Sequence, residues 1–439
     1  MTYRELFAVR EFRVLFLNRC AVMISVAASG LALGTVVYDA TGSAFLSALS
    51  MFGGPLVALV TSQFLLATSD LVRPRTALML QMVGAFVSHA PQVIPGLPWQ
   101  FRFVLLAIPY VVNSMFSGTQ WVIVRDIVPA ESFVLARSAL NLAVGAMQVV
   151  GYAAGGVALI WLTPTELFIL AAVADLVCVV NIVAGIKDRP ARGGGGGGGG
   201  SVVRRTRAVN RRLLTSPVTR PLYLALWVPN GLIVGCEALF VPYAHSPAGG
   251  AVAAAGWLFA ASAAGMMLGD LAIGRYVRSG LRDRLIEPLR LLLAVPYVAL
   301  LLSPPSVVVA VLAFVASAGY AASLPLQDRL LHHTDEASSG QVMGLYGQGM
   351  MIWQAVGAGI AGVVAGVVAP ARAMGIMAVA SVVVTLLLTR GLRRSVVTSP
   401  ALPDSDRSSG GTSGTDHTGD TAGSGGVSSG GGDGVVQPT

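Results

Sequence analysis

The sequence is built from apolar runs of roughly 20 residues, the length that a helix needs to cross about 30 Å of hydrocarbon, separated by short polar stretches. These runs predict about twelve membrane-spanning helices in two sets of six. The first set is expected at Val14–Val37, Ala44–Ala67, Ala77–Ile94, Phe103–Val124, Ala139–Leu162 and Leu167–Ile186. The second set is expected at Leu222–Tyr243, Val252–Ile273, Leu289–Leu302, Val307–Leu324, Val342–Val367 and Ala373–Leu388.

The composition agrees with a membrane protein. Of the 439 residues, 54% are hydrophobic and 11% are charged, which excludes a water-soluble fold because an average soluble domain has about 25% charged residues. We therefore predict an all-α, polytopic membrane protein. The cysteines Cys20, Cys178 and Cys236 lie within apolar runs and offer neither a disulfide framework nor a metal-ligand spacing.

The distribution of basic residues predicts the orientation. With the amino terminus in the cytoplasm, Arg102 and Arg372 are the only ones of the 29 Lys and Arg residues that fall in outer loops, and Arg19 falls inside a span. Basic residues are retained in cytoplasmic loops, so we expect both termini to be cytoplasmic. The same placement explains the net charge of +8 without nucleic acid as a partner. The first segment is charged and its apolar run lacks a cleavage site, so we expect no cleavable signal peptide.

The two sets of spans divide the chain into four segments. We predict an N-terminal six-helix half at 1–186, a cytoplasmic Gly/Arg-rich linker at 187–220, a C-terminal six-helix half at 221–394 and a disordered cytoplasmic tail at 395–439. The linker begins with a glycine run and should be flexible there. Its arginine-rich part is either a solvated linker or an amphipathic helix that turns Val209, Leu213 and Leu214 to lipid.

Six spans, a basic linker and six more spans resemble the outline of the major facilitator superfamily, whose halves are related by a repeat around a midplane cavity. The local sequence resembles the bacterial drug and siderophore exporter branch of that superfamily. Phe12–Arg19 is similar to the start of that branch's first helix, and Val37–Ser43 is similar to its first outer turn. The inner loops Arg125–Glu131 and Leu326–Arg329 resemble corresponding loops of the two halves.

The loop after the second span resembles the gating loop of the superfamily, in which an Asp and basic residues bridge helix ends and stabilise one gating state. The similar stretch is Leu66–Arg75, which lacks the leading glycine and the first arginine of that loop. It keeps Asp70, Arg73 and Arg75. The resemblance implies a gating role for these three residues. Ordinary cytoplasmic charges beside a helix end are the alternative.

A glycine-rich stretch in the fifth span resembles an element of the superfamily's antiporters, with Tyr152 in place of proline. Its glycines are Gly145, Gly151, Gly155 and Gly156. Small residues at this spacing also let two helix backbones approach closely, whatever the function. The stretch therefore indicates either an antiport signature or close helix packing.

Glu237, in the seventh span, is the preferred proton carrier. Ionisable residues inside a membrane are costly, so each one needs a reason. Helix-breaking residues surround Glu237 and allow the span to bend beside a cavity that water can reach. They are Pro229, Gly231, Gly235 and Pro242. The alternative is a carboxyl group that bonds neighbouring helices for a structural purpose.

Three further charges lie within the spans. Asp175 is a second candidate for proton coupling, although a structural role suits the sixth helix, which is peripheral in the superfamily. Asp270 is expected to pair with Arg275 or Arg278 at the inner surface. Arg19 is equally suited to binding an anionic substrate or a carboxylate and to snorkelling toward the membrane interface.

Amide side chains within the spans are candidates for lining the cavity, although interhelical hydrogen bonds use the same residue types. They are Asn113, Asn141, Gln148, Asn230, Gln348 and Gln354, of which Asn113 and Asn141 are preferred for substrate binding. His89, His332 and His333 are expected to be structural or solvated.

The sequence as a whole predicts a secondary transporter that exports a small amphipathic molecule, with the proton gradient as its energy source and no cofactor. The direction rests on the resemblance alone. An uptake carrier or proton symporter of the same fold is the first alternative, and a non-transporting receptor or scaffold is the second. No phosphate-binding loop, zinc-protease motif or nucleophile elbow occurs, so we expect neither an ATP-driven pump nor an enzyme. We expect a monomer in the bacterial plasma membrane, with the lipid bilayer and a small-molecule substrate as its partners.

Overall fold

The computed structural model describes residues 3–65, 72–116, 118–129, 132–159, 161–191, 210–250, 254–277, 279–333 and 339–397. Every regular element within these ranges is a helix. Asp70, the glycine run of the linker and the tail beyond Val397 lie outside the described residues, and so do the side-chain surroundings at 141, 145 and 148.

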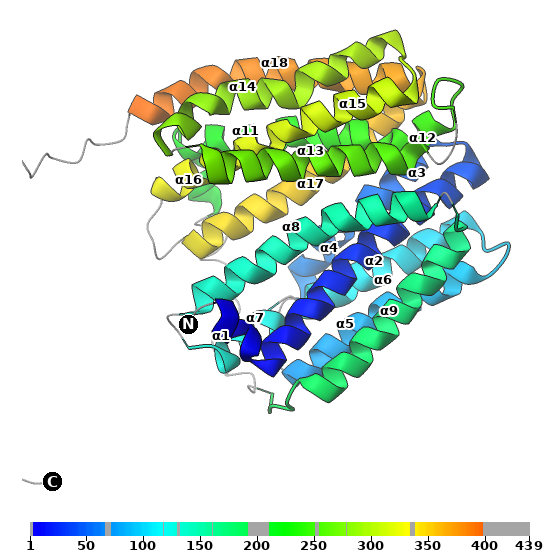
Figure 1. Ribbon diagram of the computed structural model, residues 1–439, viewed down its shortest axis with the longest axis vertical. Coiled ribbons are helices and arrows are strands. Elements are labelled where there is room, and N and C mark those ends of the chain that lie inside the picture. The colour runs from blue at the N-terminus through cyan, green and yellow to red at the C-terminus, as the bar shows by residue number, and fades with distance from the viewer. Residues whose placement is uncertain are drawn as a thin grey trace, which may run out of the picture. The chain divides into compact units, whose positions relative to one another are not determined.

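Helical segments occupy each span expected in the first half of the chain (Figure 1). A short helix, α1 (Tyr3–Ala8), precedes them. The second span is divided at Gly53, where its two helices meet at 54°. In order, the spans are α2 (Arg10–Thr41), α3 with α4 (Ala44–Phe52 and Gly54–Leu65), α5 with η2 (Pro74–His89 and Ala90–Val93), α6 with α7 (Trp99–Phe116 and Thr119–Ile127), α8 (Phe133–Ala158) and α9 (Pro164–Gly185).

The second half of the chain also has a helical segment in each expected span. The seventh span is interrupted at Leu239, whose φ of −91° and ψ of 1° are not helical. Pro242 favours this break because it has no N–H to donate to the carbonyl of Ala238. The spans are α11 with α12 (Thr219–Ala238 and Phe240–Ala244), α13 (Ala254–Tyr276), α14 with η4 (Ser279–Val298 and Ala299–Leu302), α15 with η5 and α16 (Ser306–Ser317, Ala318–Ala322 and Ser323–His332), α17 (Ser339–Ala365) and α18 (Pro370–Val397).

Local sequence signals mark several helix ends. Gly42 ends α2 in the left-handed conformation, with a φ of 62°, which glycine adopts without strain. The next residue, Ser43, caps α3 by accepting a hydrogen bond from the N–H of Leu46 at 3.3 Å. At the start of α9, Thr163 and Glu166 form a capping box. These side chains satisfy backbone groups that the helices leave open at their ends.

The lengths of the described helices suit a bilayer. By length and composition, eight of them can cross a membrane, and two bent pairs raise the number to ten. The two remaining expected spans are the third, which contains α5 and η2, and the fifth, which contains α8. In the ninth span, α14 remains helical through Pro288 and Pro296. Prolines are tolerated in spanning helices because neighbouring groups satisfy the freed carbonyls.

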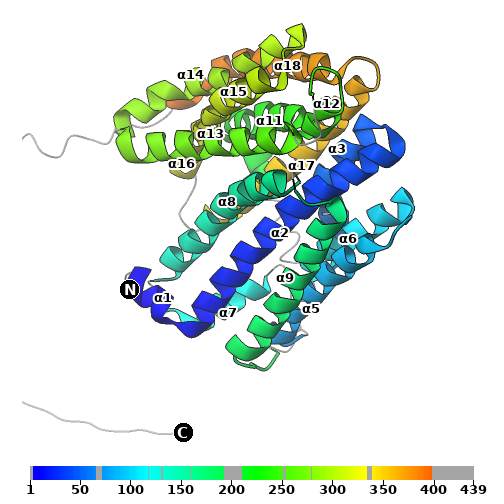
Figure 2. The same cartoon turned by 45° about the vertical axis from the view of Figure 1, so that its right-hand side comes forward.

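The helices pack as two groups, which follow the order of the chain (Figures 1 and 2). In the first group, α1 to α9, α2 packs against α8 and α9, and α5 packs against α6 and α9. In the second group, α11 to α18, α11 packs against α17 and α18, and α13 packs against α15. The main contacts between the groups join α8 to α13 and α3 to α17.

Two glycines that were expected to bend the seventh span instead serve packing. In α11, Gly231 faces the carbonyl of Trp353, and a Cβ added at Gly235 would lie 2.6 Å from the carbonyl oxygen of Gly357. Both contacts are with α17. The helix stays continuous through both glycines and ends only at Ala238. The absent side chains therefore let α11 and α17 approach closely, as small residues do in membrane bundles.

The described end of the linker also differs from one of its two expected forms. Residues 210–215 are helical, and Leu213 is buried in an apolar cluster with residues of α11, α14 and α18. Leu213 therefore does not face lipid, whereas Leu214 is exposed and Val209 lies outside the described residues. At the other end of the C-terminal half, α18 continues to Val397, past the expected boundary at 394.

We predict that Gly265→Ala lowers the midpoint of thermal unfolding in detergent. A Cβ at Gly265 of α13 would overlap the backbone carbonyl of Phe314 in α15, and overpacking of this kind costs about 1–3 kcal/mol. The matched control is Gly274→Ala in the same helix, where nothing lies within 4 Å of the added methyl group. The control should be neutral or slightly stabilising, because alanine favours a helix more than glycine does. Equal effects of the two substitutions would contradict the packing described here.

Candidate functional site

Glu237 lies near the end of α11, two residues before the break at Leu239, and the residue is half-buried. Two hydroxyl groups from other helices donate hydrogen bonds to its Oε1 atom. Ser262 of α13 donates at 2.5 Å, and Tyr320 of η5 donates at 3.3 Å. The other oxygen, Oε2, makes no hydrogen bond within the described protein. Oε2 is thus the atom left for water, a proton or a substrate.

The hydroxyl groups around Glu237 form a small polar cluster within an apolar core. The Oγ atoms of Ser262 and Ser317 lie 2.8 Å apart, and Ser317 is fully buried. The ring of Tyr297, in α14, is fully buried, and its hydroxyl has no hydrogen-bond partner among the described residues. A carboxylate held by hydroxyl donors can remain charged, and a protonated carboxyl can instead donate to the oxygen of Ser262. The cluster can therefore hold either form of Glu237.

Sequence reasoning found Glu237 but not its partners. Ser262 and Tyr320 come from the eighth and tenth spans, and serine and tyrosine residues within apolar runs give no distinct signal of their own. Their placement depends on how α13 and η5 pack against α11. The 3₁₀ turn of η5 presents Tyr320 to Glu237, whereas the sequence predicted a continuous span there.

The amide side chains that were expected to line the cavity lie in different surroundings. Asn230 is buried in α11 and accepts a hydrogen bond from Gln354 of α17 at 3.2 Å, which is the interhelical role. Asn113 and Gln348 are exposed. The side chains of Asn141 and Gln148 lie outside the described part of the chain.

Asp175 is joined to His89 in the interior of the first group. The Nδ1 atom of His89 in α5 lies 2.7 Å from Oδ2 of Asp175 in α9, and Asp175 is 2% exposed. This contact joins α5 to α9 within the first group and does not involve Glu237, so proton coupling and a structural role both stay open for Asp175. Arg19 of α2 is half-buried and has no hydrogen bond or ion pair within the described residues.

The expected pairing of Asp270 is absent from the described residues. Its Oδ1 atom is buried without a hydrogen-bond partner, and Arg275, one turn farther along α13, is exposed. Asp270 therefore does not form the expected surface pair with Arg275. Arg278 lies outside the described residues.

The basic residues of the expected gating loop join the start of α5 to the end of α9. Arg73 forms an ion pair with Asp188 at 2.6 Å, and Arg75 donates to the carbonyl of Val183 at 2.6 Å. Arg73 is exposed and Arg75 is half-buried. The two residues bridge the ends of α5 and α9, and the gating role of the loop stays a prediction. Asp70 lies outside the described residues.

A second and less exposed set of charges holds the same end of the first group. Arg189, just after α9, bonds to Glu11 at the start of α2 at 2.5 Å and lies 3.7 Å from Asp126 in α7. The other oxygen of Glu11 accepts a hydrogen bond from the N–H of Lys187 at 2.8 Å. These contacts fasten the beginning of the linker to the first group. In the second group, Arg329 of α16 pairs with Asp283 of α14 at 2.9 Å.

Glycines of the antiporter-like stretch lie at two helix interfaces. A Cβ at Gly151 or Gly155 would lie 2.8 Å from the backbone of α2, within the first group. Gly156 instead faces Gly256 of α13, and neither position has room for a Cβ. The stretch therefore packs α8 against both groups, in agreement with the packing interpretation. The surroundings of Gly145 lie outside the described part.

Aromatic contacts accompany this approach between the two groups. The rings of Tyr152 in α8 and Phe259 in α13 stack with their centroids 5.0 Å apart. Gly362 of α17 is packed against Phe45 of α3. These residues lie toward the end of the bundle at which α2 finishes and α13 begins.

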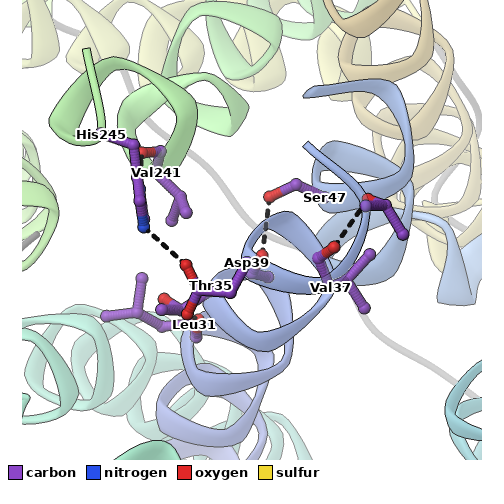
Figure 3. Close-up of polar contacts among 9 residues, drawn as sticks. Leu31, Thr35, Val37, Asp39, Ser47, Val241 and His245 are labelled. Atoms are coloured by element: carbon purple, nitrogen blue, oxygen red, sulfur yellow. Dashed lines mark hydrogen bonds and ion pairs between the residues drawn. The ribbon is translucent and has the colours of Figure 1, made fainter. Parts of the chain in front are cut away.

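A polar contact that the sequence analysis did not identify joins the groups at the same end (Figure 3). The Nε2 atom of His245, which follows α12, lies 2.8 Å from Oδ1 of Asp39 near the end of α2. The rings of His245 and Tyr38 have centroids 4.8 Å apart. The only sequence signal was a histidine at the outer end of the seventh span.

The two groups therefore meet at one end of the bundle. At the opposite end, the short helices α1 and α7 have their main contacts within the first group, and α16 has its main contacts within the second, as far as the described residues extend. With a cytoplasmic amino terminus, as the basic residues predict, the joined end faces outward.

We predict that Arg189→Gln destabilises the protein more than Arg73→Gln. Loss of the Arg189 guanidinium leaves the buried carboxylate of Glu11 without its charged partner, at a cost of about 1–3 kcal/mol. The pair of Arg73 and Asp188 is exposed to solvent, so its loss should cost less than about 1 kcal/mol. Thermal unfolding ranks the two variants, and hydrogen exchange at the start of α2 locates the effect. The reverse ranking would contradict this prediction.

No protein-family model matches the sequence, and neither does any curated protein. Solved structures do match over most of the chain. A POT family transporter in complex with a thioalcohol-conjugated peptide has a TM-score of 0.66 and 12% identity, covering 88% of this chain and 96% of its own. The peptide transporter POT in complex with sulfate has a TM-score of 0.65 and 14% identity, covering 90% and 99%.

A third similar structure is a bacterial homologue of the human lysosomal transporter Spinster in an inward-facing and occupied conformation. It has a TM-score of 0.62 and 14% identity, and the match covers 89% of this chain and 98% of that one. At such identities the likeness concerns the fold, and membership of the exporter branch stays a prediction. The chain has the fold of the major facilitator transporters, an all-α membrane bundle of about twelve spans in two six-helix halves.

Proposed function

We propose that this protein is a proton-coupled secondary transporter that exports a small amphipathic molecule by alternating access. The observation that carries the proposal is the Glu237 carboxylate, which lies within a spanning segment, is held by two hydroxyl groups and keeps one oxygen free. A carboxylate in the membrane is costly unless function requires it. The two six-helix groups supply the moving parts that alternating access needs.

The arrangement of the groups supports a state of this cycle in which the predicted outer end is closed. Contacts between them gather at the predicted outer end, where Gly156 meets Gly256 and His245 meets Asp39. Separation of the opposite ends would open the region between the groups to the cytoplasm. The Spinster homologue with a similar fold is itself described as inward-facing and occupied.

Protonation of Glu237 would change its bonds to neighbouring helices. The charged form accepts hydrogen bonds from Ser262 of α13 and Tyr320 of η5. The neutral form accepts less strongly and gains a proton to donate, so its preferred positions relative to α13 and η5 differ. We infer that this difference couples proton binding to the movement of helices in the second group.

The proposed direction of transport rests on the resemblance of the motifs to those of exporters. A second candidate is proton-coupled uptake, because similar structures include POT family transporters in complex with a thioalcohol-conjugated peptide and with 5-aminolevulinic acid. Substrates with both an amine and a carboxylate therefore belong in the assay beside cationic amphipathic dyes. A receptor or scaffold of this fold would move neither class of substrate.

We predict that Glu237→Gln abolishes substrate accumulation driven by a pH gradient but retains exchange of labelled for unlabelled substrate. The amide cannot carry a proton, so accumulation in proteoliposomes should fall at least about ten-fold, while exchange at equal pH should stay within about two-fold of the wild type. The matched control is Asp270→Asn, which removes a carboxyl group from α13 outside the Glu237 cluster and should keep gradient-driven accumulation.

The orientation of the gradient distinguishes export from uptake. With labelled substrate outside, an acidic vesicle interior drives accumulation by an antiporter, whereas an acidic exterior drives accumulation by a symporter. Protein-free vesicles correct for passive trapping of basic dyes. Gradient-driven accumulation that survives Glu237→Gln would remove this residue as the carrier. The absence of both accumulation and exchange for all substrates in the wild type would contradict the transport proposal for these substrate classes.

A further inference from the structure

His245 lies between two oxygen atoms, one on each side of its ring (Figure 3). Its Nδ1 atom is 2.9 Å from the carbonyl oxygen of Val241, one turn earlier in the chain. Its Nε2 atom is 2.8 Å from Oδ1 of Asp39 in α2. Both distances are those of hydrogen bonds.

The two contacts together require an extra proton. A neutral imidazole has one N–H and one acceptor nitrogen, and neither a carbonyl oxygen nor an ionised carboxylate can donate to the acceptor. Both bonds form only when the ring carries two protons or when the carboxyl of Asp39 is itself protonated. Asp39 has a side chain that is 56% exposed, which favours its charged form. The extra proton therefore belongs on the ring of His245.

The surroundings of the ring leave Asp39 as its charged partner. Tyr38 contacts the ring as an aromatic neighbour, and the hydroxyl of Tyr243 is bonded instead to the carbonyl oxygens of Ala248 and Pro304. The neighbouring helix α3 contains no titratable residue, and neither does the outer part of α13. Of the other helices in contact, α11 has Glu237 within its own hydroxyl cluster and α18 has the exposed Arg372 near its start.

This bond joins the two groups of helices. Asp39 belongs to the first group and His245 to the second, at the end where Gly156 and Gly256 also meet. We propose that His245 is a proton-binding site, separate from Glu237, whose protonated ring latches the predicted outer ends of the two halves together. The inference rests on the proposed alternating access for its meaning, but the latch itself can be measured without transport.

The expected direction of the pH effect follows from the geometry. When the proton leaves, one of the two ring nitrogens presents a lone pair to an oxygen acceptor, either Asp39 across the groups or the carbonyl of Val241, and in both cases the charge attraction between the ring and Asp39 is lost. The protonated ring is the form that makes both hydrogen bonds, so we expect acid to favour joining and alkali to favour separation. A hydrogen bond between charged groups, reduced by the exposure of Asp39, corresponds to a change of about three- to ten-fold in the ratio of joined to separated molecules.

The test measures the distance between the outer ends with spin labels. Cysteines at Ala40 and Pro247, both exposed, would carry the labels in the full chain with Cys20→Ser, since the remaining cysteines are buried. Pulsed dipolar spectroscopy in lipid nanodiscs, from about pH 5 to about pH 9, spans the range over which a histidine changes charge. The short-distance population should fall as the pH rises. A distribution that is the same at both extremes would overturn the proposal.

Matched substitutions identify the group that responds. His245→Lys keeps a positive charge throughout this range and should keep the short distance at both extremes. His245→Gln and Asp39→Asn should each give a pH-independent distribution with fewer joined molecules. A His245→Gln variant that titrates like the wild type would assign the response to another group and overturn the proposal.

A further variant separates this inference from the proposed proton carrier. In Glu237→Gln the outer distance should still respond to pH as in the wild type, because the two residues have no shared bond. Loss of the response in Glu237→Gln alone would place the sensor at Glu237 and overturn the role of His245. Failure of transport with an intact pH response would instead count against the proposed function and leave the latch in place.

Discussion

A peptide group in hydrocarbon has no water to bond, so each N–H and C=O of a spanning segment must find its partner within the protein. Helices meet this demand everywhere except at their breaks, and the described spans are broken at few places. Gly53 divides the second span, Leu239 divides the seventh, and the 3₁₀ turn Ala318–Ala322 interrupts the tenth. Two of these breaks border the hydroxyl cluster of Glu237. The site thus occupies the part of the bundle where regular helical bonding gives way.

Close helix packing has two different uses in this protein. Within the second group, Gly231 and Gly235 bring the backbones of α11 and α17 together as a lasting contact. Between the groups, Gly156 and Gly256 make an equally close approach, although few polar bonds accompany it in the described residues. Without a hydrophobic driving force between helices in lipid, such contacts depend on shape and on the bonds beside them. An interface of this kind can separate without exposing many unsatisfied groups.

The fold was predictable because the length and polarity of a run are sufficient to identify a spanning helix. The candidate site around Glu237 was less predictable from the sequence. Glu237 stands out as an acid within an apolar run, but the partners that hold it come from other spans, and hydropathy does not record how those spans are rotated against each other. The same limit explains why Asp270 was expected in a surface pair, and why lipid was one of the two surroundings expected for Leu213. His245 and Asp39 are farther apart still, 206 residues in sequence, and meet only through the packing of two halves.

The break at Leu239 also allows the two helical pieces of the seventh span to move separately. Glu237 lies on the longer piece, which is clamped between α17 and α18, and His245 lies beyond the short piece, about 12 Å away along a helical rise. A rigid rod through both positions would force them to turn together. Because one non-helical residue, Leu239, lies between them, α12 can tilt with the partner half while α11 keeps its position against α17 and α18. The seventh span then consists of two helices joined by a hinge, so that Glu237 and His245 can move independently of each other.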